Sequence, residues 1–176
     1  ASHPKIAKQF HLPFQSGNDR VLKEMNRHYD RAQYLSLVEY GKSVMPDLVL
    51  TSDVIVGFPG ETEEEFEETI SLIEQVHYDS LFTFIFSPRT GTPAATMVDP
   101  TTKEEKNRRF DRLCAVQNNI SEQIHQAYVG KVLRCLVDGQ DKDLLTARTE
   151  GGRLVRFPGD VNSVGNFVDL TITGAT

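Results

Sequence analysis

The sequence has 176 residues, of which 39% are hydrophobic and 25% are charged. It can bury one good hydrophobic core and a second small one, which argues against disorder. Since no apolar run approaches the roughly 20 residues that cross a bilayer, and no signal-peptide pattern is present, we expect a cytoplasmic protein without membrane contact. The net charge of −6 argues against tight nonspecific binding of nucleic acid, although a local site remains possible.

The first 46 residues are expected to hold one short strand and two helices. The strand covers residues 10–14 and delivers residues 15–17 into a turn. Asn18 can cap the first helix, and Asp30 opens the second with a capping box. This helix should stop before Pro46, because the residue before a proline disfavours the helical conformation.

The most informative stretch joins a strand at 48–56, a glycine turn at 57–60 and a helix at 63–76. The strand is almost continuously apolar, as expected for a parallel strand covered on both faces. Asp53 lies near its C-terminal end and should point the same way as Thr51 and Ile55. An acid at that end of a parallel barrel strand is a functional candidate by position alone.

A further strand at 81–86 and a long helix at 103–126 complete the first part of the chain. Between them, residues 87–100 contain three prolines and little periodicity, which predicts a long loop over the strand ends. Strands that alternate with helices at this spacing predict a parallel sheet, open or closed.

Beyond Gly130 the hydrophobic period changes to two. Short strands between glycine-rich turns predict a small antiparallel β-barrel as a second domain. We therefore divide the chain into domains at residues 1–127 and 128–176. The expected strands cover 131–137, 144–149, 153–157 and 167–173.

Three groups of reactive or charged residues have ordinary structural explanations. Cys114 and Cys135 fall on apolar faces and outside any cysteine cluster motif, so both are expected to fill cores rather than bind metal. His11 and His28 have no partner at ligand spacing and are interpreted as structural or surface histidines. The acidic run at 61–68 is expected to be a solvated helix face.

Four ordered motifs resemble the radical S-adenosylmethionine (SAM) methylthiotransferases, and in particular their tRNA-modifying, MiaB-type branch. The motifs are HLPFQSGND at 11–19, MNR at 25–27, TSDVIVGFPGETEEEFEET at 51–69 and FIFSPRTGTPAA at 84–95. The resemblance implies an α/β fold: the second half of a partial TIM-like (β/α) barrel with parallel strands over 1–127. A small all-β TRAM domain, an OB-like barrel that binds RNA, would follow over 128–176.

Such enzymes cleave SAM to a deoxyadenosyl radical and add a methylthio group to C2 of a prenylated adenosine next to the anticodon. The resemblance implies SAM, the tRNA anticodon stem-loop and a flavodoxin-type electron donor as partners. The CxxxCxxC triad that holds the SAM-binding iron-sulfur cluster is absent. The clusters would therefore be bound by residues outside this chain, which carries no catalytic residue and should be inactive alone.

The resemblance also implies a set of cofactor-binding residues. Arg27 offers a planar fork for the SAM carboxylate, Gln15 can meet the amino acid moiety or ribose, and Asp53 can accept from ribose hydroxyls. The alternatives are a surface ion pair, a turn-capping amide and a buried hydrogen-bond anchor, respectively. The glycine turn would approach the adenine with its backbone. The set is Gln15, Ser16, Arg27, Asp53, Gly57, Pro59, Gly60 and Phe86.

Basic residues in the loop and the β domain are RNA-binding candidates. Those of the β domain include outward strand positions, but six acids balance six bases there, so a generic surface is the alternative. The set is Arg89, Lys131, Arg134, Arg148, Arg153 and Arg156.

Two other functions remain open at this point. A sibling enzyme methylthiolates an aspartate of a ribosomal protein, and the Gln15-Ser16 pair resembles the tRNA branch instead. A noncatalytic RNA-binding protein with a degenerate barrel is the alternative outside enzymes.

Overall fold

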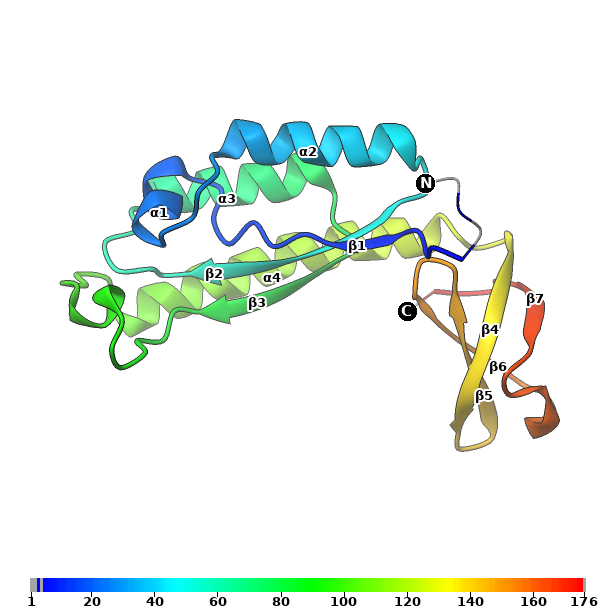
Figure 1. Cartoon of the computed structure of the whole chain (residues 1–176). Coiled ribbons are helices and arrows are strands. Elements are labelled where there is room, and N and C mark those ends of the chain that lie inside the picture. Colours follow the sequence, from blue (N-terminus) through cyan, green and yellow to red (C-terminus); the bar gives the residue numbers. More distant parts are fainter. Residues whose placement is uncertain (1–2, 4, 176) are drawn as a thin grey trace.

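The computed structural model describes residue 3 and residues 5–175. They form a parallel α/β unit followed by a separate all-β unit (Figure 1). The elements of the first unit are β1 (Gln9–His11), α1 (Asp19–Glu24), α2 (Arg31–Val44), β2 (Val49–Val56), α3 (Glu63–Val76), β3 (Ser80–Ile85), the 3-10 helix η1 (Pro93–Thr96) and α4 (Lys103–Gln126). Those of the second are β4 (Val132–Asp141), β5 (Leu144–Thr149), β6 (Leu154–Phe157), the 3-10 helix η2 (Val161–Ser163) and β7 (Phe167–Thr171).

The three strands of the first unit form one parallel sheet in the order β1-β2-β3. This confirms the α/β architecture, but β1 ends earlier than the expected strand over 10–14. Pro13 has no N–H to give to a ladder. At the next residue, the Phe14 N–H donates to the Ser52 hydroxyl instead of a β2 carbonyl. Regular pairing returns only at Gln15, which forms an isolated bridge with Val54.

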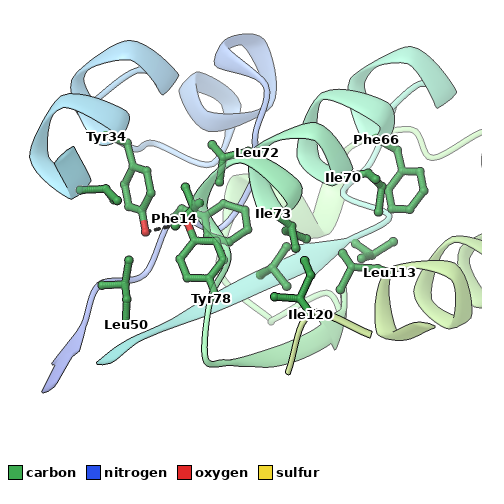
Figure 2. Packing of buried hydrophobic residues seen from close by; sticks show 14 residues of the cluster. Phe14, Tyr34, Leu50, Phe66, Ile70, Leu72, Ile73, Tyr78, Leu113 and Ile120 are labelled. Atoms are coloured by element: carbon green, nitrogen blue, oxygen red, sulfur yellow. Dashed lines mark hydrogen bonds between the residues drawn. The ribbon is translucent and has the colours of Figure 1, made fainter. Parts of the chain in front are cut away.

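The helices pack their apolar sides against one face of this sheet and build the main core (Figure 2). Leu50, Val54 and Val56 of β2 meet residues of α2, α3 and α4 there. The expectation that β2 is covered on both faces holds only in part, because no residue of β2 is exposed but Asp53 and Ile55 are only partly buried. On the opposite face, Thr51 is buried and Asp53 and Ile55 are partly buried, whereas Phe82 and Phe84 of β3 are more than half exposed. We refer to this more open side of the sheet as the uncovered face.

Local sequence signals set the helix ends as expected. Asp30 and Thr62 each close a complete capping box, with Gln33 and Glu65 as the respective partners. The Asn18 side chain accepts the Val21 N–H at the start of α1. The bounds of α3 and α4 agree with those expected from sequence. No helix in the described part of the chain is both long and apolar enough to span a bilayer.

The second unit is a four-stranded antiparallel sheet in the order β6-β5-β4-β7, which confirms the all-β prediction. Cys135, Val137, Leu145 and Ala147 form its small buried core. Cys135 fills a core as expected, whereas Cys114 on α4 is only partly buried. The strands β2 and β3 point away from this unit, which therefore lies near their N-terminal ends (Figure 1).

Candidate functional site

The uncovered face of the parallel sheet gathers polar and aromatic side chains from all three strands. Parallel register places His11 beside Thr51, and Asp53 beside Phe82. The His11 Nε2 lies 3.3 Å from Asp53 Oδ1, and its Nδ1 lies 3.0 Å from the Thr51 hydroxyl. The edge of the His11 ring meets Phe82 at a centroid distance of 5.7 Å. This arrangement fits an Nε2–H that donates to Asp53 while the Thr51 hydroxyl donates to Nδ1.

Gln15 follows β1, and its backbone pairs with β2 beside Asp53. Its N–H donates to the Asp53 carbonyl at 2.9 Å, and its own carbonyl accepts the Ile55 N–H at 2.9 Å. The backbone of Gln15 is left-handed, with φ of 65°, although it is not a glycine. Such a conformation is strained and persists only where the surroundings impose it. The structure thus joins the backbones of Gln15 and Asp53, and Gln15 is only 6% exposed.

Ser16 and Arg27 are placed differently from each other. The Ser16 hydroxyl is buried, 3.5 Å from that of Thr69 on α3, and accepts the Asn18 N–H at 3.3 Å. It anchors the turn between β1 and α1 and does not lie on the uncovered face. Arg27 is exposed just after α1 and forms no ion pair with any residue that the structure describes. Its guanidinium is therefore available to an external anion.

The turn after β2 needs glycine at two positions. Gly57 and Gly60 both have positive φ, of 72° and 75°. A Cβ on Gly57 would also lie 2.7 Å from the side chain of Lys106 on α4. Pro59 is buried within the turn. Phe86 follows β3 beside it and meets Phe58 edge-on at 5.2 Å, while the Lys106 ammonium lies 5.8 Å from the Phe86 ring centroid.

Glu61 closes this turn from inside the protein, which corrects the interpretation of residues 61–68 as one solvated face. Its side chain is only 1% exposed, and its carboxylate accepts the Gly57 N–H at 2.8 Å. Arg109 of α4, whose side chain is 6% exposed, donates to the Glu61 carbonyl at 2.9 Å and lies 3.6 Å from its carboxylate. The same guanidinium also bonds Glu63 at 2.9 Å and Glu105 at 3.1 Å. A buried ion pair therefore fixes the shape of the glycine turn.

Burial raises the pKa of Glu61 from 4.5 to about 7, although the Gly57 N–H and Arg109 act in the opposite direction. Since the folded state binds this proton more tightly than the unfolded state, the associated stability is present below pH 4.5 and is lost as the pH rises to about 7. Relative to Glu61→Gln, which cannot ionise, wild-type stability should fall by on the order of 3 kcal/mol across this window. Urea unfolding of both proteins at several pH values measures the difference. A difference that stays constant with pH would contradict the prediction.

The basic candidates of the β unit do not share one environment. Arg134 lies over the Phe167 ring at 4.7 Å, and Lys131 over the Tyr128 ring at 5.1 Å. Arg148 and Arg156 are half exposed and face Asp138 and Asp141 at 2.9 and 3.3 Å. Arg89 is exposed in the loop after β3.

Arg153 departs from the expected phosphate-contacting face of the β unit. Its side chain is only 16% exposed and pairs with Asp79 of the parallel unit. It therefore contacts protein where a phosphate contact was expected.

Sequence reasoning missed several residues around the site. Glu61 was not distinguished from the acidic residues that follow it, although a side chain four residues after Gly57 can reach back to the Gly57 N–H across the turn. Arg109 has a detectable signal, because its helical spacing places it on the same stripe of α4 as the buried Leu113, Gln117 and Ile120. His11 gave no signal of its own, since its contact with Asp53 depends on the register of two strands.

Comparisons with known families agree with the two-unit fold. Residues 4–73 match the Radical SAM superfamily, and residues 126–176 match the TRAM domain. The structure of coproporphyrinogen III oxidase from Escherichia coli, a radical SAM enzyme, has a similar fold. That similarity has a TM-score of 0.54 at 19% identity and covers 64% of this chain and 27% of the other.

Curated relatives are similar along nearly the whole chain. A tRNA-2-methylthio-N(6)-dimethylallyladenosine synthase of Clostridium botulinum (strain Langeland) is 49% identical over 97% of this chain. The protein of the same name from Symbiobacterium thermophilum is 51% identical over 97% of it. The chain spans 39% and 37% of the length of these relatives. Its motifs, its parallel sheet, its antiparallel unit and these similarities agree, and the chain belongs to the MiaB-type branch of the radical SAM superfamily.

Proposed function

We propose that this chain is part of a tRNA methylthiotransferase, which adds a methylthio group to C2 of a prenylated adenosine next to the anticodon. The observation that carries the proposal is the identity of 49–51% along 97% of the chain to synthases with this activity in their names. The Gln15-Ser16 pair also favours a tRNA substrate over an aspartate of a ribosomal protein. A TRAM match next to a radical SAM match supports an enzyme rather than an RNA-binding protein alone.

The parallel unit is proposed to bind SAM at the C-terminal ends of its strands. The donor set there suits the ligand: Asp53 can accept from ribose hydroxyls, Arg27 can pair with the carboxylate, and the Gln15 amide can both donate and accept. The backbone of Gly57, Pro59 and Gly60, with Ser16 behind Gln15 and Phe86 beside the turn, completes the proposed pocket. When bound in the full-length enzyme, SAM supplies the radical and the methyl group. The residues of this chain hold and orient it.

Iron-sulfur clusters are assigned to residues of the full-length enzyme outside this chain. Cys114 lies on α4 and Cys135 lies in the core of the β unit, so the two cysteines belong to different units and do not form a ligand set. The electron donor is proposed to be a flavodoxin-type protein and the compartment the cytoplasm.

The β unit, taken as residues 128–176, is proposed to supply affinity for the tRNA anticodon stem-loop. The TRAM match supports this division. Lys131, Arg134, Arg148 and Arg156 keep exposed cationic ends near its surface, and Arg89 adds one in the loop of the parallel unit. Phosphate contacts of this kind position RNA without reading its sequence.

In the full-length enzyme, Arg27→Ala should weaken SAM binding by about 1.5–3 kcal/mol, the usual scale of a charge-assisted hydrogen bond. Calorimetric titration with SAM measures this loss of affinity. A separate experiment, mass spectrometry of tRNA and of ribosomal protein, identifies which of the two is methylthiolated. Lys23→Ala, at an exposed position of α1, serves as the charge-matched control. Unchanged SAM affinity would remove Arg27 from the site, and a modified ribosomal protein would replace the proposed substrate.

A further inference from the structure

The turn between β5 and β6 packs against the N-terminal ends of β1 and β2. A Cβ on Gly151 would lie 2.1 Å from Val49 Cγ2, and a Cβ on Gly152 would lie 2.5 Å from the Gln9 side-chain oxygen. Gly152 also has a positive φ of 78°. Only glycine lets the backbone of this turn approach the sheet so closely. The Lys8 ammonium adds an ion pair to Glu150 at 3.6 Å.

Arg153 ends this turn and joins the two units through its guanidinium. It pairs with the Asp79 carboxylate, donates to the Tyr128 hydroxyl at 2.8 Å and lies over the Tyr128 ring at 4.5 Å. Arg148 and Arg156, by comparison, are 50% and 51% exposed. A planar, partly buried guanidinium that stacks and pairs at once is a strong and directional contact.

Asp79 is itself held rigidly where β2, β3 and α4 meet. Its carboxylate accepts the Leu50 N–H at 2.7 Å, and its backbone N–H donates to the Leu50 carbonyl at 2.9 Å. The Ser121 hydroxyl of α4 donates to the Asp79 carbonyl at 3.0 Å. The partner of Arg153 is therefore part of the rigid sheet and not of a mobile surface.

We propose that Arg153 is a positioning residue, which fixes the orientation of the β unit relative to the parallel sheet through its pair with Asp79, while Tyr128 of the β unit holds its guanidinium in place. The consequence depends on geometry. Lys106 and Arg109 near the start of α4 contact the glycine turn, and the β unit follows the other end of this helix. The 24 residues of α4 extend about 36 Å.

A tRNA bound to the β unit must therefore reach across the length of the sheet to present a base at the C-terminal strand ends. This step rests on the function proposed above. A fixed angle between the two units then limits which nucleotide reaches the site, so Arg153 contributes to the choice of nucleotide and not to RNA affinity.

The test measures the distance between the units in the whole chain. Spin-labelled unnatural side chains at Glu39 and Asp143, exposed positions of α2 and of the β4–β5 turn, leave both cysteines unchanged. Pulsed electron resonance should give one narrow distance distribution in the wild type. Arg153→Ala and Asp79→Asn should at least double its width. Arg148→Ala, which removes an exposed arginine of the same unit, should leave the width of the distribution unchanged. Arg153→Lys should give a width between those of the wild type and Arg153→Ala.

An unchanged width in Arg153→Ala, with circular dichroism confirming that the variant is folded, would overturn the proposal. Binding of a transcribed anticodon stem-loop provides the second readout. Arg153→Ala should bind it within about twofold of the wild type, since the guanidinium faces protein. A large loss of affinity would show that Arg153 is a phosphate contact and would also overturn the proposal. If the wild-type chain binds no RNA, the proposed function of the β unit fails, while the distance measurement still decides the role of Arg153.

Discussion

Arg109→Ala is expected to destabilise the chain by about 3–5 kcal/mol at a pH of about 8, the scale for breaking a buried ion pair by removing one partner. The variant would leave the Glu61 carboxylate buried, with the Gly57 N–H and the positive charge of Lys106 to stabilise it. It would also lose the bond from Arg109 to the Glu61 carbonyl. Urea unfolding followed by circular dichroism measures the change. Because Arg109 lowers the pKa of Glu61, its removal should raise that pKa above the wild-type value of about 7. The loss should therefore shrink as the pH falls toward about 7 and change little below it, where Glu61 carries a proton in both proteins.

Arg108→Ala provides a matched control for this experiment. Arg108 is the next residue of α4 and bonds the same Glu63 and Glu105, but its side chain is 53% exposed. Exposed ion pairs contribute little because water screens them. We therefore expect Arg108→Ala to unfold nearly as the wild type does. Equal losses in both variants would show that burial of the Arg109 ion pair does not determine its contribution.

Replacing Arg134 and Arg156 together by alanine is expected to weaken binding of a tRNA anticodon stem-loop by about tenfold at low salt. Both guanidinium groups lie at the surface of the β unit, one over the Phe167 ring and one near Asp141. If each contacts one phosphate, the slope of log affinity against log salt should become shallower by about 2. Gel-shift titrations at several salt concentrations measure both quantities.

The control removes the same charge from the other unit. Arg108 and Arg112 lie on α4 with side chains 53% and 40% exposed. Replacing both with alanine should leave RNA affinity within about twofold of the wild-type value. An equal loss in the two double variants would mean that only net charge matters. Unchanged affinity in the Arg134 and Arg156 variant would exclude these residues as the RNA contacts.

Helices and their ends were predictable because their signals are local. Capping at Asp30 and Thr62 depends on residues within one turn, and the predicted bounds of α3 and α4 agree with the structure. The period of two along β2 likewise placed Asp53 on the same face as Thr51 and Ile55. The strand over 10–14 was too long because the prediction did not give enough weight to the missing N–H of Pro13.

The parts of the site that could not be predicted depend on contacts between distant residues. His11 meets Asp53 only because the register of β1 and β2 places them on one face. Alternation places Arg153 on the side of Val155 and Phe157, which pack against the small core, and Arg148 on the outward side next to Ala147. It cannot predict that Arg153 pairs with Asp79 of the other unit. The contact of the Ser16 hydroxyl with Thr69 likewise depends on how α3 packs against the turn that holds Ser16.

The sequence by itself determined the two units, their helices and strands, and the family motifs, because periodicity, capping and turn residues act over a few positions. Only the tertiary structure decided that Glu61 is a buried acid rather than part of a solvated run, and that Arg153 joins the two units. Whether a charged side chain is solvated or paired depends on which remote segment packs over it. Burial then sets its energetic cost and its role.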